Sequence, residues 1–260
     1  MVLISGAARG IGAQTAQSMA LEGAIVFIAD ILDEQSQKVA REINDHGDKA
    51  FALHLDVTDE NSWQKVIDSV LESTGQLDVL VNNAGIVLAQ NFEEASLQDW
   101  QKLVNVNMTS VFLGTKLCAP ALRKSGHNSV GGSSIINLSS VLGLVAAPND
   151  PLYSMTKGGV TLFTKSTAVT FANKGDPIRV NSIHPGVIET QMGEQVIAAQ
   201  AKRLGITDAN RVRELTAERH PIGRMGQTKD VANAALFWAS DKAAFITGSN
   251  LVVDGGYTAQ

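Results

Sequence analysis

Tyr153 and Lys157 lie four residues apart in a stretch with helical character, so both side chains are expected on one face of a helix. A phenol with a free pKa of about 10 is a poor base at neutral pH, and lowering that pKa to about 7 requires about 4 kcal/mol. One cation about 4 Å away supplies an energy of this size at an effective dielectric constant of about 20. The pair could therefore transfer a proton, although the same spacing is also typical of a solvated helix face.

A glycine-rich segment near the start of the chain is typical of a phosphate-binding turn. Residues 5–12, SGAARGIG, put Gly6, Gly10 and Gly12 where a predicted strand turns into a helix. Gly6 would permit the tight turn, Gly10 would let the backbone approach a pyrophosphate, and Gly12 would let the helix pack closely on the strand. The spacing differs from the standard G-x-G-x-x-G fingerprint, so the turn alone is a weak signal.

Asp30 ends the second predicted strand, eighteen residues after Gly12. An acid near this offset, about 20 residues, meets the adenosine ribose of a dinucleotide, where its carboxylate accepts hydrogen bonds from the 2′-hydroxyl and repels a 2′-phosphate. Ile31 stands where an NADP site would carry a basic residue, whereas Arg9 is the contrary signal because it could reach a 2′-phosphate. Asp30 could also cap the next helix, as could Asp33. The charges favour NAD, and its oxidised nicotinamide would add a second positive charge beside Tyr153.

Ser140 follows the predicted strand 134–138 and precedes Tyr153 by thirteen residues. Ligands bind in the crevice outside the carboxyl ends of parallel strands. A hydroxyl there could bind the substrate oxygen and stabilise the alkoxide that develops as hydride leaves. Ser139 is the alternative hydroxyl. No base for a nucleophilic serine is evident, so we do not expect a serine hydrolase.

Short β-branched runs alternate with amphipathic stretches along the whole chain, which predicts one α/β domain over residues 1–260. The expected architecture is a Rossmann-type, doubly wound parallel sheet with helices on both faces. Seven strands are expected, at 2–5, 25–30, 50–56, 79–82, 134–138, 179–184 and 250–253. Helices are expected at 11–22, 33–46, 97–124, 152–173 and 229–240, with another between Asp59 and Gly75.

Gly158 and Gly159 fall inside the predicted helix 152–173. Each glycine costs about 0.5–1 kcal/mol there relative to alanine, so another helix is expected to approach this backbone closely.

The composition excludes several classes of protein. The 21 Lys and Arg against 26 Asp and Glu give a net charge of −5, the wrong sign for a nucleic-acid binder. The single cysteine, Cys118, forms no internal disulfide and is expected in the core, and we predict no metal site. The apolar start is too short for a signal peptide, and no run approaches the ~18 apolar residues of a membrane span. A cytoplasmic location is expected.

Taken together, the motifs resemble those of the short-chain dehydrogenase/reductase family in order and spacing over nearly the whole chain. They are SGAARGIG at 5–12, Asp56-Val57, NNAG at 82–85, Asn107, Ser140, YSMTK at 153–157 and His-Pro-Gly at 184–186. The resemblance implies the strand order 3-2-1-4-5-6-7 and a catalytic tetrad of Asn107, Ser140, Tyr153 and Lys157. Tyr153 would be the acid and base, Ser140 would orient the substrate oxygen, Lys157 would hold the nicotinamide ribose, and Asn107 would position a water.

The expected cofactor is NAD, with contacts from the glycine-rich turn and from loops that follow the strands. Its predicted contacts are Gly6, Arg9, Gly10, Ile11, Gly12, Asp30, Ile31, Asp56, Val57, Asn83, Ala84, Gly85, Tyr153, Lys157, Pro185, Gly186, Ile188 and Thr190.

The expected substrate is a hydrophobic secondary alcohol, oxidised reversibly to its ketone, because the residues around the predicted pocket are apolar. The predicted substrate contacts are Ser140, Leu142, Leu144, Tyr153, Met192 and Val196, with Val141, Val145 and Ile197 as neighbours and Glu189 as the charged neighbour. Residues 190–220 would form a lid that excludes water. The closing segments resemble those of bacterial secondary-alcohol, cyclic-alcohol and hydroxysteroid dehydrogenases, and the family resemblance implies a homotetramer.

Three alternatives compete with this interpretation. A ketoacyl carrier-protein reductase shares the tetrad, but it generally uses NADPH, which Asp30 disfavours. A sugar epimerase of the broader family would need more chain after the sheet. A catalytically silent dinucleotide-binding sensor would have no reason to keep Ser140, Tyr153 and Lys157 in register.

Overall fold

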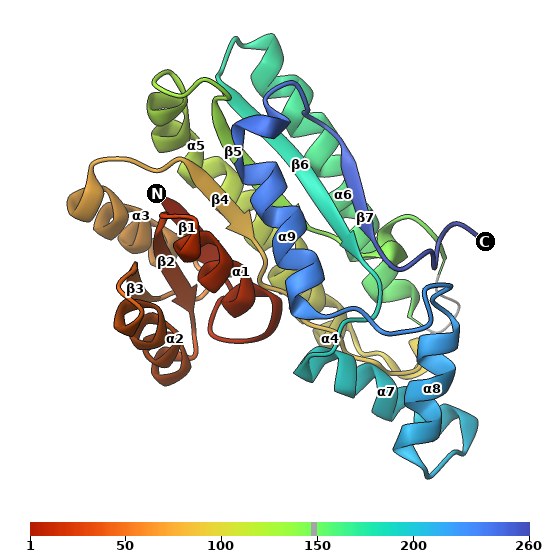
Figure 1. The fold of residues 1–260 in the computed structure, drawn as a ribbon. Helices are drawn as coiled ribbons and strands as arrows, with labels where there is room; N and C mark the ends of the chain where they lie inside the picture. Colours follow the sequence, from red (N-terminus) through yellow and green to blue (C-terminus); the bar gives the residue numbers. More distant parts are fainter. Residues whose placement is uncertain (147–149) are drawn as a thin grey trace.

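A single parallel sheet organises the chain, for which a computed structural model describes residues 1–146 and 150–260. The sheet has seven strands in the order β3-β2-β1-β4-β5-β6-β7 (Figure 1). The strands are β1 (Val2–Ser5), β2 (Ile25–Asp30), β3 (Lys49–His54), β4 (Val79–Asn82), β5 (Ser133–Leu138), β6 (Ile178–Pro185) and β7 (Asn250–Val253). The predicted fold class and strand order are confirmed, and the predicted strand bounds differ from these by at most two residues.

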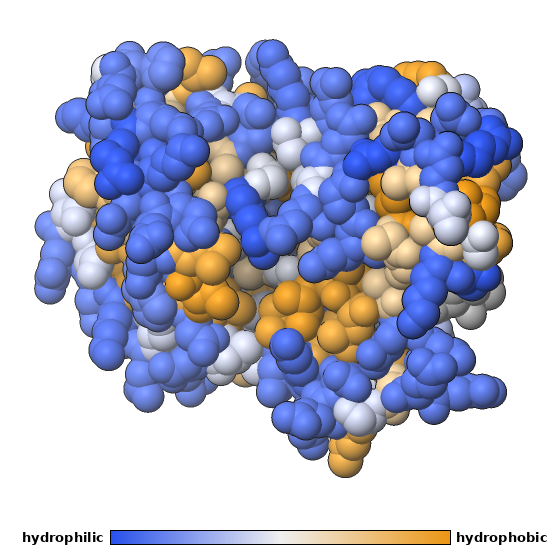
Figure 2. Space-filling view, turned by 90° about the horizontal axis from the view of Figure 1, so that it is seen from below, coloured by the Kyte–Doolittle hydropathy of each residue, from blue (hydrophilic) through white to orange (hydrophobic). Residues whose placement is uncertain are grey.

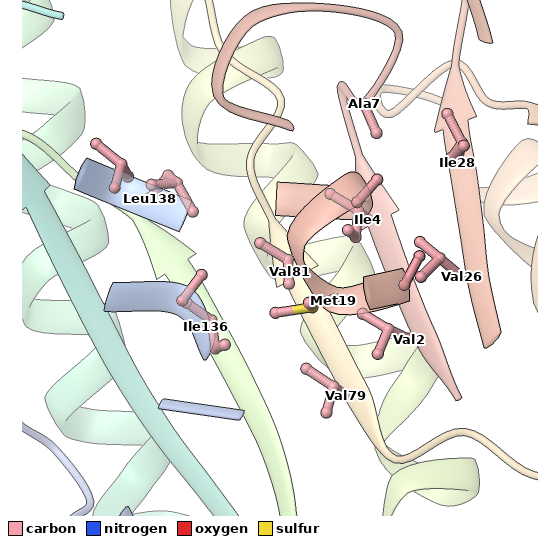
Figure 3. Packing of buried hydrophobic residues seen from close by; sticks show 14 of the residues in the cluster. Val2, Ile4, Ala7, Met19, Val26, Ile28, Val79, Val81, Ile136 and Leu138 are labelled. Atoms are coloured by element: carbon pink, nitrogen blue, oxygen red, sulfur yellow. The ribbon is translucent and has the colours of Figure 1, made fainter. Parts of the chain in front are cut away.

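Alternate residues of each strand enter two hydrophobic cores, because both faces of the sheet are covered. Val2 and Ile4 belong to the first core, in which Met19 of helix α1 (Gly10–Leu21) packs beside them (Figure 3). Leu3, between them, enters the second core together with Trp63.

Helices cover both faces of the sheet, as the alternating sequence pattern predicts. On the first face lie α1 (Gly10–Leu21), α2 (Asp33–Asp45) and α9 (Thr228–Ala239), and on the second lie α3 (Glu60–Thr74), α5 (Ser110–Gly126) and α6 (Pro151–Asn173). Asp59 caps α3 by accepting a hydrogen bond from the Asn61 amide, and Gly75 ends it with a φ of 74°. Short 3-10 turns lie at Phe92–Glu94, Val141–Gly143 and Asp241–Ala243.

The predicted helix 97–124 is interrupted, which corrects the expectation of one continuous helix. It consists of α4 (Leu97–Val104), a π-helical turn at Asn105–Thr109, and α5. Such turns insert one extra residue into a helix and occur frequently at functional sites. This one buries Asn107 at its centre.

Two helices follow β6 within the predicted lid, α7 (Gln191–Leu204) and α8 (Ala209–Glu218), and they extend below the sheet in Figure 1. They share a small core of their own, formed by Ile197, Val212 and Met225. Among the helices of residues 1–146 and 150–260, none has the length and apolar character needed to cross a membrane.

The neighbour that Gly159 accommodates is the π-helical turn of the same chain. A Cβ added at Gly159 would lie 2.6 Å from Cε of Met108, whereas one added at Gly158 would have no neighbour nearer than 4.0 Å. Gly159 therefore has a close neighbour, as expected. Gly158 has none among the residues that the structure describes.

Gly114 on α5 is buried and Gly158 on α6 is half-buried, and together they allow a matched test of how closely these helices are packed. Gly114→Ala should lower the free energy of unfolding by about 2 kcal/mol, because overpacked cores cost about 1–3 kcal/mol. The added Cβ would lie 2.4 Å from Oδ1 of Asn82 and 2.8 Å from the ring of Trp63, both buried. Gly158→Ala should leave stability unchanged or raise it by about 0.5–1 kcal/mol. Urea denaturation compares the two variants, and equal effects would contradict the packing described.

Candidate active site

The carboxyl edge of the sheet collects most of the residues singled out from the sequence. Asp30 ends β2, Gly85 follows β4, Ser140 follows β5, and Gly186 follows β6. Figure 2 views the molecule from the side toward which these strands point, and hydrophobic side chains gather there in a hollow bordered by hydrophilic ones. This is the edge at which ligands bind in open parallel sheets.

The glycine-rich turn has the conformation that its sequence predicts. Gly6 and Gly10 have φ values of 65° and 59°, in the left-handed region that favours glycine. A Cβ at Gly6 would lie 2.7 Å from Cα of Ala84, and one at Gly12 would lie 2.4 Å from the Gly6 carbonyl oxygen. All three positions therefore require glycine.

The loop after β4 is fastened to this turn by hydrogen bonds. Nδ2 of Asn83 donates to the carbonyl oxygens of Ser5 (3.0 Å) and Gly6 (2.8 Å). The amides of Asn83 and Ala84 each donate to Oγ of Ser5 at 3.2 Å. Through these hydrogen bonds, Asn83 and Ala84 hold the glycine-rich turn in its conformation.

The N-terminus of α1 fits a phosphate. Its N-cap residue, Arg9, makes no side-chain capping hydrogen bond, so within the described residues no cap side chain satisfies the first-turn amides of Gly10, Ile11 and Gly12. Amides in this position, with the positive end of the helix dipole, form an anion site. The side chain of Arg9 points elsewhere, toward Oε1 of Gln191 at the start of α7, with which it forms a hydrogen bond.

Asp30 is buried between the turn and the end of its strand. Its Oδ2 accepts from the Ala8 amide (3.0 Å), and its Oδ1 accepts from the Leu32 amide (3.1 Å). A carboxylate has about four acceptor positions, so each oxygen retains capacity for a ribose hydroxyl. Ile31 beside it is exposed.

Three further predicted NAD contacts, Asp56, Val57 and Ile188, differ in what they can offer a ligand. Asp56 is exposed, and its Oδ1 accepts from the amide and hydroxyl of Thr58. Val57 has its side chain in the second core, and its carbonyl oxygen accepts from Nε1 of Trp63 at 3.0 Å. Ile188 likewise lies in the first core, so only the backbone of Val57 and Ile188 remains to meet a ligand.

Of the two candidate serines, Ser140 is the one placed at the site. The Ser139 hydroxyl is hydrogen-bonded to the Lys157 carbonyl oxygen and to Thr161 Oγ1, both at 2.9 Å, so it joins β5 to α6. Ser140 is extended, and its Oγ accepts from the Leu142 amide at 3.1 Å, beside Tyr153.

Lys157 is buried with its ammonium turned toward the end of β5. Nζ donates to the Leu138 carbonyl oxygen at 2.8 Å and lies 5.6 Å from the centre of the Tyr153 ring. A Cβ at Gly85 would lie 3.5 Å from this Nζ and 3.4 Å from Oδ1 of Asn107, so the absence of a side chain at Gly85 lets three elements meet.

Asn107 holds these elements together from the π-helical turn. Its Oδ1 accepts from the Ile86 amide at 2.8 Å, and its Nδ2 donates to the Ile86 carbonyl (2.9 Å) and to Oγ1 of Thr156 (3.2 Å). Tyr153 therefore lies beside Ser140 and Lys157, while Asn107 reaches the same helix, α6, through Thr156.

Comparisons with known proteins agree with this arrangement. A family model described as "Enoyl-(Acyl carrier protein) reductase" matches residues 6–258. The chain belongs to the short-chain dehydrogenase/reductase family. It is 42% identical over 262 residues to a cyclopentanol dehydrogenase of Comamonas sp., covering 100% of this chain and 97% of that one.

Two further likenesses extend this result. A trans-4-hydroxycyclohexanecarboxylate dehydrogenase of Sinomonas cyclohexanicum is 40% identical over 265 residues, with 100% of this chain and 93% of the relative covered. A crystal structure of 3-ketoacyl-(acyl-carrier-protein) reductase from Brucella melitensis, complexed with NADH, is 32% identical with a TM-score of 0.86, covering 99% of this chain and 97% of the other. The chain is an oxidoreductase whose family uses a nicotinamide dinucleotide.

Burial shifts the pKa values of both Tyr153 and Lys157 in the polypeptide by itself, and the predicted effect of an oxidised nicotinamide on the phenol stays a prediction. Burial raises the pKa of Tyr153 above its ordinary value, and the hydrogen bond with Ser140 offsets this only in part. Burial also lowers the pKa of Lys157 to about 8, which weakens its charge at alkaline pH. Because both side chains are removed from water, the Tyr153 phenol stays protonated in the polypeptide by itself.

Sequence reasoning did not single out Asp150, and it gave His184 no role of its own. Asp150 caps α6 by accepting from the Tyr153 amide at 3.0 Å, its carboxyl pKa is raised by burial, and its charge also raises the pKa of Tyr153. His184 is buried beneath Ser140, with Nδ1 2.9 Å from the Ser140 carbonyl oxygen. The sequence motif His-Pro-Gly at 184–186 includes this residue, but the motif does not indicate its contact with Ser140.

The expected apolar wall is only partly realised. Leu142, Met192 and Val196 are half-buried and Leu144 is 40% exposed, as open pocket residues would be. Val141 and Ile197, named as neighbours, are 4% and 3% exposed, and Ile197 packs in the small core of the lid. Among the described residues, no group of three or more His, Cys, Asp and Glu side chains could hold a metal ion.

The lowered pKa of Lys157 predicts a pH dependence of stability. Because the folded pKa of about 8 lies below the unfolded value of about 10.4, the unfolded chain binds this proton more tightly, and the wild type gains stability as pH rises between these values. Lys157→Met lacks this gain. Its unfolding free energy relative to wild type should therefore fall by about 2–3 kcal/mol between about pH 7 and about pH 10.

Urea denaturation at both pH values measures this difference. Lys165→Met, on the exposed side of the same helix, is the control for removal of a lysine. A difference between Lys157→Met and wild type that does not change with pH would show that the ammonium is not desolvated as described.

Proposed function

We propose that this protein is an NAD-dependent dehydrogenase that reversibly oxidises a hydrophobic secondary alcohol to its ketone, with Tyr153 as general acid and base. The observation that carries the proposal is the grouping of Ser140, Tyr153 and Lys157 at the carboxyl edge, beside an uncapped helix N-terminus that fits a phosphate. A bound NAD would supply the hydride acceptor.

The chain's own residues would divide the remaining tasks. Ser140 Oγ would hydrogen-bond the substrate oxygen and stabilise the developing alkoxide. Tyr153 would take the hydroxyl proton, which requires that a second positive charge join that of Lys157, because burial alone raises the pKa of the phenol. Lys157 would also hold the ribose hydroxyls, and Asn107 would keep the loop after β4 against α6 while a water is positioned there.

The substrate class rests on the apolar character of the hollow and on the relatives. Leu142, Leu144, Met192 and Val196 offer no charge to a ligand. Relatives named for cyclopentanol and hydroxycyclohexanecarboxylate support a secondary alcohol in which the carbinol carbon belongs to a ring. Residues 190–220 would close over such a substrate and exclude water.

A homotetramer is also part of the proposal. Phe112 on α5 and Leu162 and Val169 on α6 are 46%, 66% and 58% exposed, which supports burial of these two helices against another copy. The small-molecule partner and the cytoplasmic location expected from the sequence stay predictions.

A ketoacyl carrier-protein reductase is the second candidate, favoured by the resemblance to the Brucella melitensis structure. Assays with cyclic alcohols, acyclic secondary alcohols, hydroxysteroids and a ketoacyl thioester, followed by NADH absorbance, separate the two candidates. Turnover of the thioester alone would reject the alcohol dehydrogenase, and NADH binding without turnover of any compound would favour a silent sensor.

Tyr153→Phe should reduce turnover by at least about a thousandfold, because an essential proton transfer loses its carrier. Its affinity for NADH should stay within about threefold of wild type. Fluorescence titration measures binding and NADH absorbance measures turnover. Ser140→Ala should also lose most turnover, whereas Ser139→Ala should lose stability instead, because its hydroxyl joins β5 to α6. Turnover by Tyr153→Phe at the wild-type rate would reject its acid and base role.

Asp30→Ala should narrow the preference for NAD over NADP by about ten- to a hundredfold in kcat/KM, because a buried carboxylate no longer repels the 2′-phosphate. Asp33→Ala removes the same charge from an exposed position three residues away and should change the ratio far less. A ratio that Asp30→Ala leaves unchanged would remove Asp30 from cofactor choice.

A further inference from the structure

His220 lies just after the second lid helix, α8, and is 2% exposed although that helix is mostly at the surface. Both of its ring nitrogens have protein partners. Nδ1 lies 2.8 Å from the Thr216 carbonyl oxygen, and the Val187 amide donates to Nε2 at 3.2 Å. His220 therefore joins the end of the lid to the segment that follows β6.

These partners define the form of the imidazole. A carbonyl oxygen can only accept, so Nδ1 carries the hydrogen, and a backbone amide can only donate, so Nε2 is the acceptor. The tautomer with its hydrogen on Nδ1 satisfies both partners. Its acceptor atom binds the amide of Val187, which lies between Gly186 and Ile188, two of the predicted NAD contacts.

Close packing on both sides of His220 leaves little freedom for this contact. A Cβ at Gly186 would lie 2.8 Å from Nε2 of His220, and one at Gly255 would lie 3.4 Å from its Cβ and 2.6 Å from Cγ2 of Ile222. The ring is therefore held between a glycine of the turn after β6 and a glycine of the C-terminal tail.

The C-terminal tail is bonded to the same turn. The Gly186 amide donates to the Val253 carbonyl, and the Ile222 amide donates to the Gly255 carbonyl, both at 3.0 Å. The ring of Tyr257 lies 5.4 Å from that of His220, and its hydroxyl accepts a hydrogen bond from Arg219. The tail thus covers the outer side of His220.

We propose that His220 is a positioning residue for the turn at Pro185–Ile188, and that the tail residue Tyr257 acts on cofactor binding through it. The inference rests on the proposed function, because Pro185, Gly186 and Ile188 of this turn are among the predicted NAD contacts. Nε2 of His220 satisfies and orients the Val187 amide, so the neighbouring backbone groups are fixed before a ligand arrives. Tyr257 prevents the imidazole from turning away.

Two substitutions separate the acceptor from the rest of the ring. His220→Gln has a side chain long enough to place an amide oxygen near the Nε2 position, so it can still accept from Val187. His220→Asn reaches only the Nδ1 position, so it can donate to Thr216 but leaves the Val187 amide without its acceptor. A buried amide left unsatisfied is costly, so His220→Asn should weaken NADH binding by about tenfold, while His220→Gln stays within about threefold of wild type.

The role of the tail is tested by Tyr257→Ala alone and in combination. Alone, it should weaken NADH binding about three- to fivefold, and added to His220→Asn it should weaken binding no further, because both changes act through one contact. The readouts are the NADH dissociation constant from fluorescence titration, the KM for NAD and kcat, with thermal unfolding as a check that each variant is folded. We expect the KM for NAD to rise with the dissociation constant, while kcat changes less than twofold.

Three outcomes overturn the proposal. In the first, His220→Asn and His220→Gln bind NADH as the wild type does and lose only stability. In the second, both variants lose NADH affinity equally, which would show that the acceptor at Nε2 does not matter. Should His220→Asn fail to fold, wild-type NADH affinity in Tyr257→Ala rejects the role of the tail. Failure of the wild type itself to bind NADH would instead reject the proposed function, which is a separate result.

Discussion

The site depends on one buried interaction, the donation of a hydrogen bond from the Lys157 ammonium to the carbonyl oxygen that ends β5. Nζ reaches Leu138 at 2.8 Å while the lysine is 4% exposed. A buried cation costs free energy unless it is hydrogen-bonded, so this contact requires α6 to run close to the end of β5. The Ser139 hydroxyl donates to the Lys157 carbonyl oxygen, and a Cβ at Gly143 would lie only 2.7 Å from the same oxygen, so both residues help to keep α6 close to β5.

The same burial defines what Tyr153 can do. It raises the pKa of the phenol and lowers that of the lysine, so the pair by itself is a proton donor rather than a base. The chain therefore holds a neutral phenol at the site, and oxidation of an alcohol requires an additional positive charge beside it. Under the proposed function, Tyr153 would accept a proton only when the cofactor site is filled, which would limit proton transfer without hydride transfer.

Close contacts between backbone segments shape the glycine-rich turn and the loop after β4. Gly85 brings the loop after β4 to Lys157 and Asn107, and Gly6 brings the glycine-rich turn to Ala84. These approaches are possible because two hydrophobic cores hold the strands rigidly on both faces of the sheet. The lid is packed separately, since α7 and α8 share a small core of their own, and α7 contacts the glycine-rich turn through the hydrogen bond between Gln191 and Arg9.

Much of the fold could be predicted from the sequence, because strands buried on both faces are short continuous apolar runs and the glycines mark the turns between them. The strand order came from the family resemblance, since local periodicity does not contain it. The π-helical turn at Asn105–Thr109 was missed because it contains no glycine or proline that would mark an interruption of the helix.

The remaining differences concern tertiary contacts. Nothing in the sequence near Val57 or Ile197 indicates that core packing would take their side chains. His220 was missed because its partners, Thr216, Val187 and Tyr257, are brought to it by three separate elements. The shift of the Tyr153 pKa depends on desolvation, which spacing along a helix cannot report.

The most direct test of this account is an ultraviolet titration of Tyr153. The chain has two tyrosines, so subtracting the titration of Tyr153→Phe from that of the wild type isolates the ionisation of Tyr153. Without NAD the phenol should ionise above its ordinary pKa of about 10, and saturating NAD should bring the pKa below that value. An ionisation already below about 10 in the protein alone, or one that NAD leaves unchanged, would contradict the central claim.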